Sequence, residues 1–308
     1  MASEAHDDPK SSQRCGYVAL VGRPNVGKST LLNHLLRQKL SITSRKPQTT
    51  RHVLLGVDTD GDCQAIYVDT PGIHDHAHRE MNRQMVRAAT AVLADVDLAI
   101  MVVERDLWTE DDERVLGHLI AHQVPSFVVL NKIDLMQRKD ALLPANAALA
   151  ERQRFEEVVP VSALRGVGLD DLRRAVCARL PLQPHLFPAD QVTDQSERFL
   201  VSEIIREKLM RRLGDEVPHH LAVVIEAYEE TANLVDIAAE IFVERPGQKR
   251  IVIGKAGEKL KQIGREARGD VEALIGKRVM LRLWVKVRPG WSNSPAGLRR
   301  VGYDPGRR

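Results

Sequence analysis

Eight residues near the start of the chain have the types and spacing needed to hold a polyphosphate. Residues 22–29 read Gly-Arg-Pro-Asn-Val-Gly-Lys-Ser, which fits the P-loop pattern G-x-x-x-x-G-K-[ST]. Glycines let the backbone N–H groups wrap an anion, and the following helix directs the positive end of its dipole at the phosphates. We expect Lys28 to contact the β- and γ-phosphate oxygens and Ser29 to offer its hydroxyl to Mg²⁺. The pattern alone does not distinguish ATP from GTP.

Two later stretches predict the rest of a magnesium and γ-phosphate site. Residues 41–52 are polar, contain one proline and show no sustained period, so we expect a loop. A threonine in such a loop closes over Mg²⁺ and the γ-phosphate in nucleotide switches, and we favour Thr50 over Thr49. Residues 69–72 read Asp-Thr-Pro-Gly. Asp69 can hold Mg²⁺ through water, and Gly72 can turn its N–H to the γ-phosphate.

The position after this tetrapeptide is aliphatic. Many small signalling GTPases have a water-orienting glutamine near this point, whereas Ile73 cannot polarise a water. Simple packing of a loop residue is the alternative interpretation, and the two are compatible. Histidine and aspartate alternate over residues 74–78 and could bind a metal, but we expect a solvated loop there.

Residues 131–134, which read Asn-Lys-Ile-Asp, indicate guanine as the base. Asp134 can accept hydrogen bonds from both N1 and the exocyclic N2 of guanine, whereas adenine has no such donor pair and would leave a charged acceptor unpaired. We expect Asn131 to tie neighbouring loops together and the Lys132 stem to cover the base. Backbone N–H groups at residues 162–164, Ser-Ala-Leu, could meet the guanine carbonyl oxygen. The predicted nucleotide-binding residues are Gly22, Arg23, Pro24, Asn25, Val26, Gly27, Lys28, Ser29, Asp69, Thr70, Pro71, Gly72, Ile73, Asn131, Lys132, Ile133, Asp134, Ser162, Ala163 and Leu164.

The elements that position these residues alternate between strands and helices. Short apolar runs at residues 17–21, 98–103 and 126–130 are typical of buried parallel strands. Helical patterns follow them, and Thr109 with four acids after it predicts a capped helix start. Residues 52–58 and 62–68 flank a hairpin turn. We therefore expect an α/β domain with a mostly parallel, doubly wound sheet and with its ligand loops at the carboxyl ends of the strands.

Composition excludes several other classes of protein. The 308 residues are 43 % hydrophobic and 28 % charged with net charge +3, and no stretch is long and apolar enough to span a bilayer. Residues 1–14 lack an apolar signal core, so we expect a disordered leader. Cys15, Cys63 and Cys177 are far apart in sequence. We expect reduced cytosolic thiols rather than a disulfide framework or a zinc site.

The C-terminal third predicts a second domain that binds RNA. A linker is expected over residues 183–195, after which the order is helix, strand, strand, G-x-x-G loop, helix and strand, the type II KH arrangement. Such loops clamp about four nucleotides, and we expect bases over Ile251, Ile253 and Ile263. A turn before a solvated basic helix is the alternative for the loop alone. The predicted RNA-binding residues are Lys249, Arg250, Gly254, Lys255, Ala256, Gly257, Lys259 and Lys261.

Taken together, these motifs resemble the bacterial Era family of ribosome-assembly GTPases. The resemblance rests on residues 22–29, on 48–52 (Gln-Thr-Thr-Arg-His), on 68–73 (Val-Asp-Thr-Pro-Gly-Ile) and on the pairing of a GTPase with a KH module, and it covers residues 16–303. It continues through residues 202–211 and 283–287. The expected domains are a leader at 1–14, a GTPase domain at 15–182, the linker at 183–195, a KH domain at 196–290 and a tail at 291–308. We expect the tail to be partly ordered surface.

The resemblance implies a GTP-hydrolysing switch that binds 16S rRNA near its 3′ end and acts in 30S subunit assembly. It implies GTP or GDP with Mg²⁺ held by Ser29, Thr50 and Asp69, and catalysis by Lys28, Thr50, Gly72 and Asn25. Some relatives use a potassium ion held partly by a P-loop asparagine, which here would be Asn25. It also implies a cytoplasmic protein with peripheral contact to the inner membrane face. No feature indicates an obligate protein partner.

Two other functions fit parts of the sequence. One is a constitutive RNA-binding protein in which the GTP site is only structural. The other is a membrane-surface GTPase whose basic C-terminal face binds lipid. RNA affinity without turnover would favour the first, and binding to anionic vesicles without RNA binding would favour the second.

Overall fold

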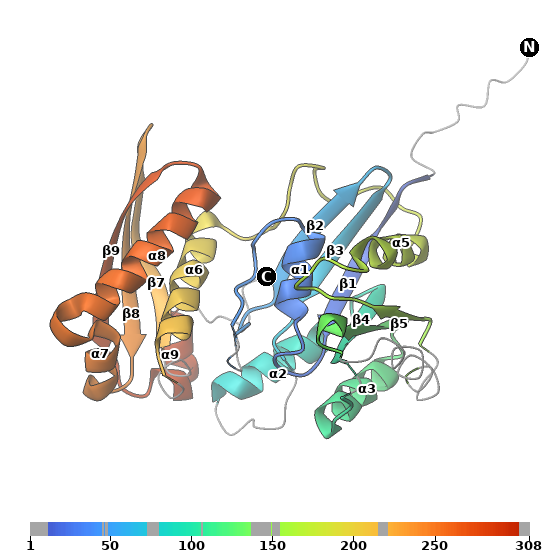
Figure 1. The fold of residues 1–308 in the computed structure, drawn as a ribbon, viewed down its shortest axis with the longest axis horizontal. Helices are drawn as coiled ribbons and strands as arrows, with labels where there is room; N and C mark the ends of the chain where they lie inside the picture. Colours follow the sequence, from blue (N-terminus) through green and yellow to red (C-terminus); the bar gives the residue numbers. More distant parts are fainter. Residues whose placement is uncertain are drawn as a thin grey trace, which may run out of the picture. The chain divides into compact units, whose positions relative to one another are not determined.

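A computed structural model of the chain describes residues 12–44, 46, 49–72, 80–105, 107–136, 149, 155–214 and 221–301. These residues belong to two compact units (Figure 1). The first comprises Met1–Leu40, Val53–His74 and Ala89–Asp194, and the second Ser41–His52, Asp75–Ala88 and Gln195–Arg308. Two segments from the N-terminal half therefore group with the C-terminal part of the chain, which the expected domain boundaries do not include.

A six-stranded sheet forms the centre of the first unit. Its order is β2-β3-β1-β4-β5-β6, with β2 antiparallel to β3 and every other neighbouring pair parallel. The expectation of a mostly parallel sheet is confirmed. The strands are β1 (Arg14–Val21), β2 (Leu54–Asp60), β3 (Cys63–Asp69), β4 (Leu98–Glu104), β5 (Ser126–Asn131) and β6 (Glu157–Pro160).

Helices cover both faces of this sheet. Residues 98–103 of β4 are each no more than 1 % exposed, as strands buried on both faces must be. Thr109 caps α3 with its side chain, and Asp112 returns the bond to the Thr109 backbone, which confirms the expected helix start. The helices are α1 (Lys28–Leu35), α3 (Glu110–His122), the short η2 (Ile133–Leu135), α5 (Leu169–Arg179) and the end of α2 (Glu80–Val92), of which only Ala89–Val92 belongs to the first unit.

The expectation of three reduced thiols is wrong for two of the cysteines. Cys63 begins β3 and Cys177 lies in α5, and the two form a disulfide across a Cα–Cα distance of 6.0 Å. Their sequence separation of 114 residues hides this pairing, which exists because α5 packs on β3. Cys15 is a buried free thiol beside Gln64.

The expected linker follows the edge of the sheet within the first unit. The N–H of Val57 donates to the carbonyl of Val192 at 2.8 Å, and the hydroxyl of Thr193 donates to the carbonyl of Leu55 at 2.6 Å. Residues 192–193 thus provide hydrogen-bond partners for one backbone N–H and one backbone carbonyl of β2. The linker covers an edge strand that would otherwise expose unpaired backbone groups.

The second unit has a three-stranded sheet of order β7-β8-β9 (Figure 1). β7 and β8 are antiparallel, and β8 and β9 are parallel. The expected order of elements is confirmed, with α7 as an additional helix before the G-x-x-G loop. The elements are α6 (Glu197–Arg212), β7 (Leu221–Glu230), β8 (Leu234–Val243), α7 (Pro246–Ile253), η5 (Lys255–Gly257), α8 (Glu258–Ile275) and β9 (Arg278–Val287).

The described part of the tail is packed rather than loose on the surface. Trp291 is 1 % exposed and clusters with Phe242, Leu298 and, from α2, Met81 and Met85. The short η6 (Trp291–Asn293) and α9 (Pro295–Arg300) carry this contact. The buried tail residues Trp291, Leu298 and Val301 belong to an apolar cluster separate from the main core of the second unit, so the expectation of partly ordered surface is wrong for them. Among the described helices, none has the length and apolar character needed to cross a membrane.

Candidate functional site

The P-loop lies between β1 and α1, at the carboxyl edge of the sheet. Gly27 has φ 105° and immediately precedes α1. A Cβ at Gly27 would lie 2.3 Å from the side-chain nitrogen of Asn131, so only glycine allows this close approach. The start of α1 is therefore held directly against the first residue of the base-reading stretch.

Lys28 is buried in the P-loop. Its ammonium donates to the carbonyls of Gly22 at 2.8 Å and Arg23 at 3.0 Å. Burial lowers the pKa of Lys28 to about 8, although the Asp69 carboxylate opposes this shift. The phosphate oxygens of a nucleotide would supply stronger acceptors and hold the lysine charged.

The oxygen ligands expected for Mg²⁺ lie together in the first unit. Ser29 donates from its hydroxyl to Asp69 at 2.9 Å, and Asp69 is fully buried at the end of β3. A hydroxyl and a carboxylate are hard oxygen ligands, so this pair fits Mg²⁺, directly or through water. The hydroxyl of Thr70 is instead used within the protein, because it donates to the carbonyl of Leu20 at 2.8 Å.

Gly72 lies against the P-loop. A Cβ at Gly72 would meet the backbone nitrogen of Pro24 at 2.8 Å. The Asp-Thr-Pro-Gly stretch is thereby adjacent to the P-loop, as the expected hydrogen bond from the N–H of Gly72 to the γ-phosphate requires. Ile73 and the histidines of residues 74–78 are outside the described residues, and the roles expected for them stay predictions. In the described part of the chain, no group of three or more His, Cys, Asp or Glu residues could hold a metal ion.

Asn131 connects three loops of the site. Its side-chain nitrogen donates to the carbonyl of Val26 at 2.8 Å, and its side-chain oxygen accepts from the N–H groups of Lys132 at 2.8 Å and Ala163 at 3.0 Å. Asn131 is 1 % exposed. One buried amide thus joins the P-loop, the base-reading turn and the loop after β6.

The base-reading carboxylate is held by the neighbouring loop. Ser162 donates from its hydroxyl to Asp134 at 2.5 Å, and Ser162 is buried. Leu164 on the same loop is strongly exposed. Asp134 follows Lys132, whose φ of 64° turns the chain sharply after β5. These contacts fix the acceptor that would distinguish guanine from adenine.

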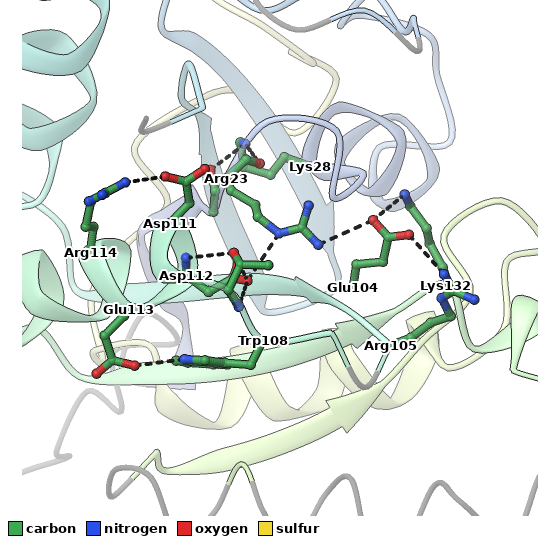
Figure 2. A network of polar contacts seen from close by, with 12 residues as sticks. Arg23, Lys28, Glu104, Arg105, Trp108, Asp111, Asp112, Glu113, Arg114 and Lys132 are labelled. Atoms are coloured by element: carbon green, nitrogen blue, oxygen red, sulfur yellow. Dashed lines mark hydrogen bonds and ion pairs between the residues drawn. The ribbon is translucent and has the colours of Figure 1, made fainter. Parts of the chain in front are cut away.

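A cluster of charges behind the P-loop was not expected from the sequence (Figure 2). Glu104, the last residue of β4, forms ion pairs with Lys132 at 2.9 Å and with Arg23 at 3.5 Å. Arg23 also donates from Nε to Asp112 at 3.1 Å. An acid at the carboxyl end of a buried strand is the sequence signal that could have identified Glu104.

Thr43 and Thr49, in the described part of the 41–52 loop, are hydrogen-bonded to α6 within the second unit. The buried carboxylate of Glu207 accepts from the N–H of Thr43 at 2.9 Å and from Arg211 at 3.0 Å. Arg206, also buried, donates to the carbonyl of Thr49. The hydroxyl of Thr49 donates to the carbonyl of Lys46 at 2.6 Å. The loop that carries the candidate threonines is therefore anchored to α6.

His52 ends this loop among charged groups. Burial lowers the pKa of His52 to about 4, despite the nearby Glu203 carboxylate, and its ring makes an edge contact with Phe199 at 5.2 Å between centroids. Burial also opposes ionisation of Glu203, yet the charge and hydrogen bonds of Arg206, together with the nearby His52 and Arg51, leave the pKa of Glu203 below its usual value. The neutral imidazole and the charged pair form one packed cluster.

The G-x-x-G loop is exposed at the start of α8. Gly254 has φ 73° and ψ −178°, a conformation available only to glycine, and Lys255 is exposed beside it. Arg250 and Lys261 are also exposed. These charges fit a sugar–phosphate backbone.

The expectation that RNA bases lie over three isoleucines is wrong for one of them. Ile251 is 44 % exposed and available to a ligand, but Ile263 is fully buried in the core of the second unit. The interior face of α8 carries Ile263, Ala267 and Val271, so only the opposite face can meet RNA.

The fold and these loops define a P-loop GTPase joined to a KH domain. The sequence model of the family described as "50S ribosome-binding GTPase" matches residues 17–132, and that of the KH domain matches residues 216–292. GTPase Era of Pseudomonas aeruginosa is 52 % identical over 98 % of this chain and 99 % of its own length. GTPase Era of Azotobacter vinelandii is 54 % identical over 96 % and 98 %. The chain belongs to the Era family and is a GTPase.

Two solved structures of Era resemble most of the chain. One is a variant of Aquifex aeolicus Era bound to GDP·AlF4⁻, and the other is Era in complex with MgGDPNP and nucleotides 1506–1542 of 16S ribosomal RNA. Each has a TM-score of 0.91 and 39 % sequence identity, and each comparison covers 94 % of this chain and 99 % of the other.

Proposed function

We propose that this GTPase is a switch in which the bound nucleotide controls how the KH domain holds the 3′ end region of 16S rRNA during assembly of the 30S subunit. The observation that carries the proposal is the anchoring of residues 41–52 to α6. Thr43 and Thr49 bond to Glu207 and Arg206, while Thr50 of the same loop is the expected ligand of Mg²⁺. The loop is hydrogen-bonded to the KH unit, and its Thr50 is expected to bind the Mg²⁺ ion of the nucleotide.

Two observations support RNA as the partner. The exposed basic residues around the G-x-x-G loop suit a phosphate backbone. A relative of the same family, with a TM-score of 0.91 to this chain, has been solved with nucleotides 1506–1542 of 16S ribosomal RNA. We propose that Gly254, Lys255, Ala256 and Gly257 clamp the equivalent strand here, with Lys249, Arg250, Lys259 and Lys261 around them.

The test is RNA binding by the full chain in two nucleotide states. A labelled single-stranded RNA matching the 16S 3′ end is titrated with protein holding a non-hydrolysable GTP analogue or GDP. We expect tighter binding with the analogue and loss of binding in Gly254→Asp. Gly117→Asp, at an open position on helix α3 of the first unit, is the control, because it adds the same charge to the other unit of the chain. Equal affinity in both states contradicts the switch but keeps the RNA module.

Glu207→Gln tests the loop contact itself. This change keeps the size of the side chain but removes the charge that faces Thr43 and Arg211. We expect the difference in RNA affinity between the two nucleotide states to shrink. Glu266→Gln, which alters an ion pair between α8 and Arg212 of α6, is the control. An unchanged difference in Glu207→Gln contradicts a role for this contact.

We further propose that Mg²⁺ is held by Ser29, Asp69 and Thr50 and that Asn25 helps hold a potassium ion. Ser29 and Asp69 are already 2.9 Å apart, which supports a shared cation between them. An added cation near the β- and γ-phosphates would stabilise charge that develops during hydrolysis. Faster turnover in potassium than in sodium buffer, lost in Asn25→Ala, is the expected result. Equal turnover in both buffers contradicts the potassium site.

We also propose a cytoplasmic protein with peripheral contact to the inner membrane face. The exposed basic residues of α8 support an attraction to anionic lipid as well as to RNA. Sedimentation with vesicles of phosphatidylglycerol and phosphatidylethanolamine tests it. Vesicle binding without RNA binding would replace the ribosomal role by the membrane role, and absence of vesicle binding would remove the membrane contact.

A further inference from the structure

Glu104 is the only acid among the described residues that pairs with both the P-loop and the base-reading turn (Figure 2). One oxygen, Oε2, lies 2.9 Å from the ammonium of Lys132 and 3.5 Å from the guanidinium of Arg23. The other oxygen lies 3.6 Å from Arg105. We propose that Glu104 is a positioning residue for guanine-nucleotide affinity, because it holds the Lys132 side chain where it covers the base.

The backbone at Lys132 directs the side chain toward Glu104. Lys132 has φ 64°, and its N–H is fixed by the Asn131 side chain at 2.8 Å. A lysine stem has many rotamers, and ordering it costs up to about 2 kcal/mol of conformational free energy. Glu104 restricts those rotamers before the nucleotide arrives. Binding then needs less ordering of this side chain.

Burial makes the ion pair stronger than one on the surface. The side chain of Glu104 is 15 % exposed and that of Lys132 is 29 % exposed. Exposed pairs of this kind contribute little because water screens both charges. Here the walls of the site exclude part of that water, so the carboxylate holds the ammonium more firmly.

Arg23 is held from its other side by α3. Its Nε donates to Asp112 at 3.1 Å, and Asp112 also accepts from the N–H of Thr109 at 3.0 Å as part of the helix cap. Arg23 is therefore fixed between Asp112 and Glu104. Because Arg23 cannot move far, the position of Glu104 is also set by the P-loop.

This arrangement predicts a particular kinetic pattern. Removing the charge of Glu104 frees Lys132, which loosens the base but leaves the γ-phosphate groups in place. The Glu104→Gln variant should raise KM for GTP roughly 10-fold with kcat unchanged, and it should speed dissociation of a fluorescent GDP by a similar factor. A general loss of structure would instead lower kcat or the unfolding temperature.

A double-mutant cycle with Lys132 tests whether Glu104 acts through that residue. Lys132→Met keeps the apolar stem and removes the ammonium. If the proposal is right, Glu104→Gln has less than about a 2-fold effect on KM in the Lys132→Met background. An effect as large as in the wild-type background overturns the proposal, as does a fall in kcat at constant KM.

Two further variants keep the test decisive. Glu104→Asp retains the charge on a shorter side chain and should give an intermediate KM, so it replaces Glu104→Gln if that variant does not fold. Asp111→Asn removes a neighbouring acid of α3 that pairs with Arg114 at 2.6 Å. It should leave KM and kcat unchanged, and a similar rise in KM for Asp111→Asn would mean that any lost charge on this surface has the same effect, which overturns the proposal.

Discussion

Ser162 donates a hydrogen bond from its Oγ to Oδ1 of Asp134, over a distance of 2.5 Å. The bond joins the loop after β6 to the turn after β5, two segments at the carboxyl edge of the same sheet. It orients the carboxylate before a base is present. Preorganisation of this kind reduces what the protein must rearrange on binding.

The first prediction concerns base specificity. In Asp134→Asn, an amide replaces an acceptor-only carboxylate, so one N–H of guanine faces a donor. We expect GTP affinity to fall at least about 100-fold and affinity for xanthosine triphosphate to rise, because xanthine offers an oxygen at that position. Ser162→Ala should cost only about 1 kcal/mol of GTP binding free energy. Competition binding against a fluorescent nucleotide measures both, and unchanged preference in Asp134→Asn would refute this role.

The second prediction concerns the disulfide. A disulfide that closes a loop of this length stabilises a folded domain by about 2–5 kcal/mol. Cys177→Ser should lower the free energy of unfolding of the GTPase domain by that amount, and added reductant should no longer affect the variant. Denaturant unfolding with and without reductant measures it. Thiol labelling of the unfolded, unreduced protein should find one thiol, Cys15, and a count of three would show that the bond does not form.

The third prediction concerns acid stability. The folded pKa of His52, about 4, lies below its ordinary value of 6.5, so the unfolded chain binds protons first as the pH falls between these values. Stability is therefore lost on acidification, by about 1–3 kcal/mol for this partly exposed side chain. Glu203, whose pKa is lowered, adds a loss in the same direction at still lower pH. The free energy of unfolding, measured at pH values from 7 to 4, should fall less steeply between pH 6.5 and 5 in His52→Gln than in the wild-type protein.

The fourth prediction compares two tryptophans of the second unit. Trp291 is 1 % exposed, whereas Trp284 on β9 is 46 % exposed. Trp291→Ala should destabilise the unit by about 3–5 kcal/mol, because it removes a buried ring from the cluster with Phe242. Trp284→Ala should cost less than about 1 kcal/mol. Thermal unfolding followed by circular dichroism distinguishes them, and equal effects would mean that the tail does not pack as described.

The sheet of the first unit could be predicted because its strands are short, apolar and uninterrupted. Runs such as residues 98–103 have no other stable place than between two layers of helices. The positions of the ligand-binding loops could be predicted from these strands, because the carboxyl ends of parallel strands share one edge of the sheet. Asp69, Asn131 and Ser162 were thereby expected near one another without any three-dimensional information.

Other features depend on contacts that a residue pattern does not contain. Arg206, Glu207 and Lys208 lie on α6 and are buried, although a run of charges usually marks a solvated face. They are buried because residues 41–52 and 270 supply partners from distant parts of the chain. Helix α7 contains the run Ile251-Val252-Ile253, whose β-branched residues favour a strand locally and are overruled by packing. The contacts of Glu104 with Arg23 and Lys132 likewise join residues that are far apart in the sequence.

The bond between Cys63 and Cys177 turns the intervening chain into a covalent ring. The base-reading residues 131–134 and 162–164 lie inside this ring, whereas the P-loop at residues 22–29 lies outside it. A protease that cuts once anywhere between the two cysteines would therefore release no fragment until a reductant opened the ring. Under oxidising conditions a nicked chain would keep both halves of its nucleotide site on one molecule.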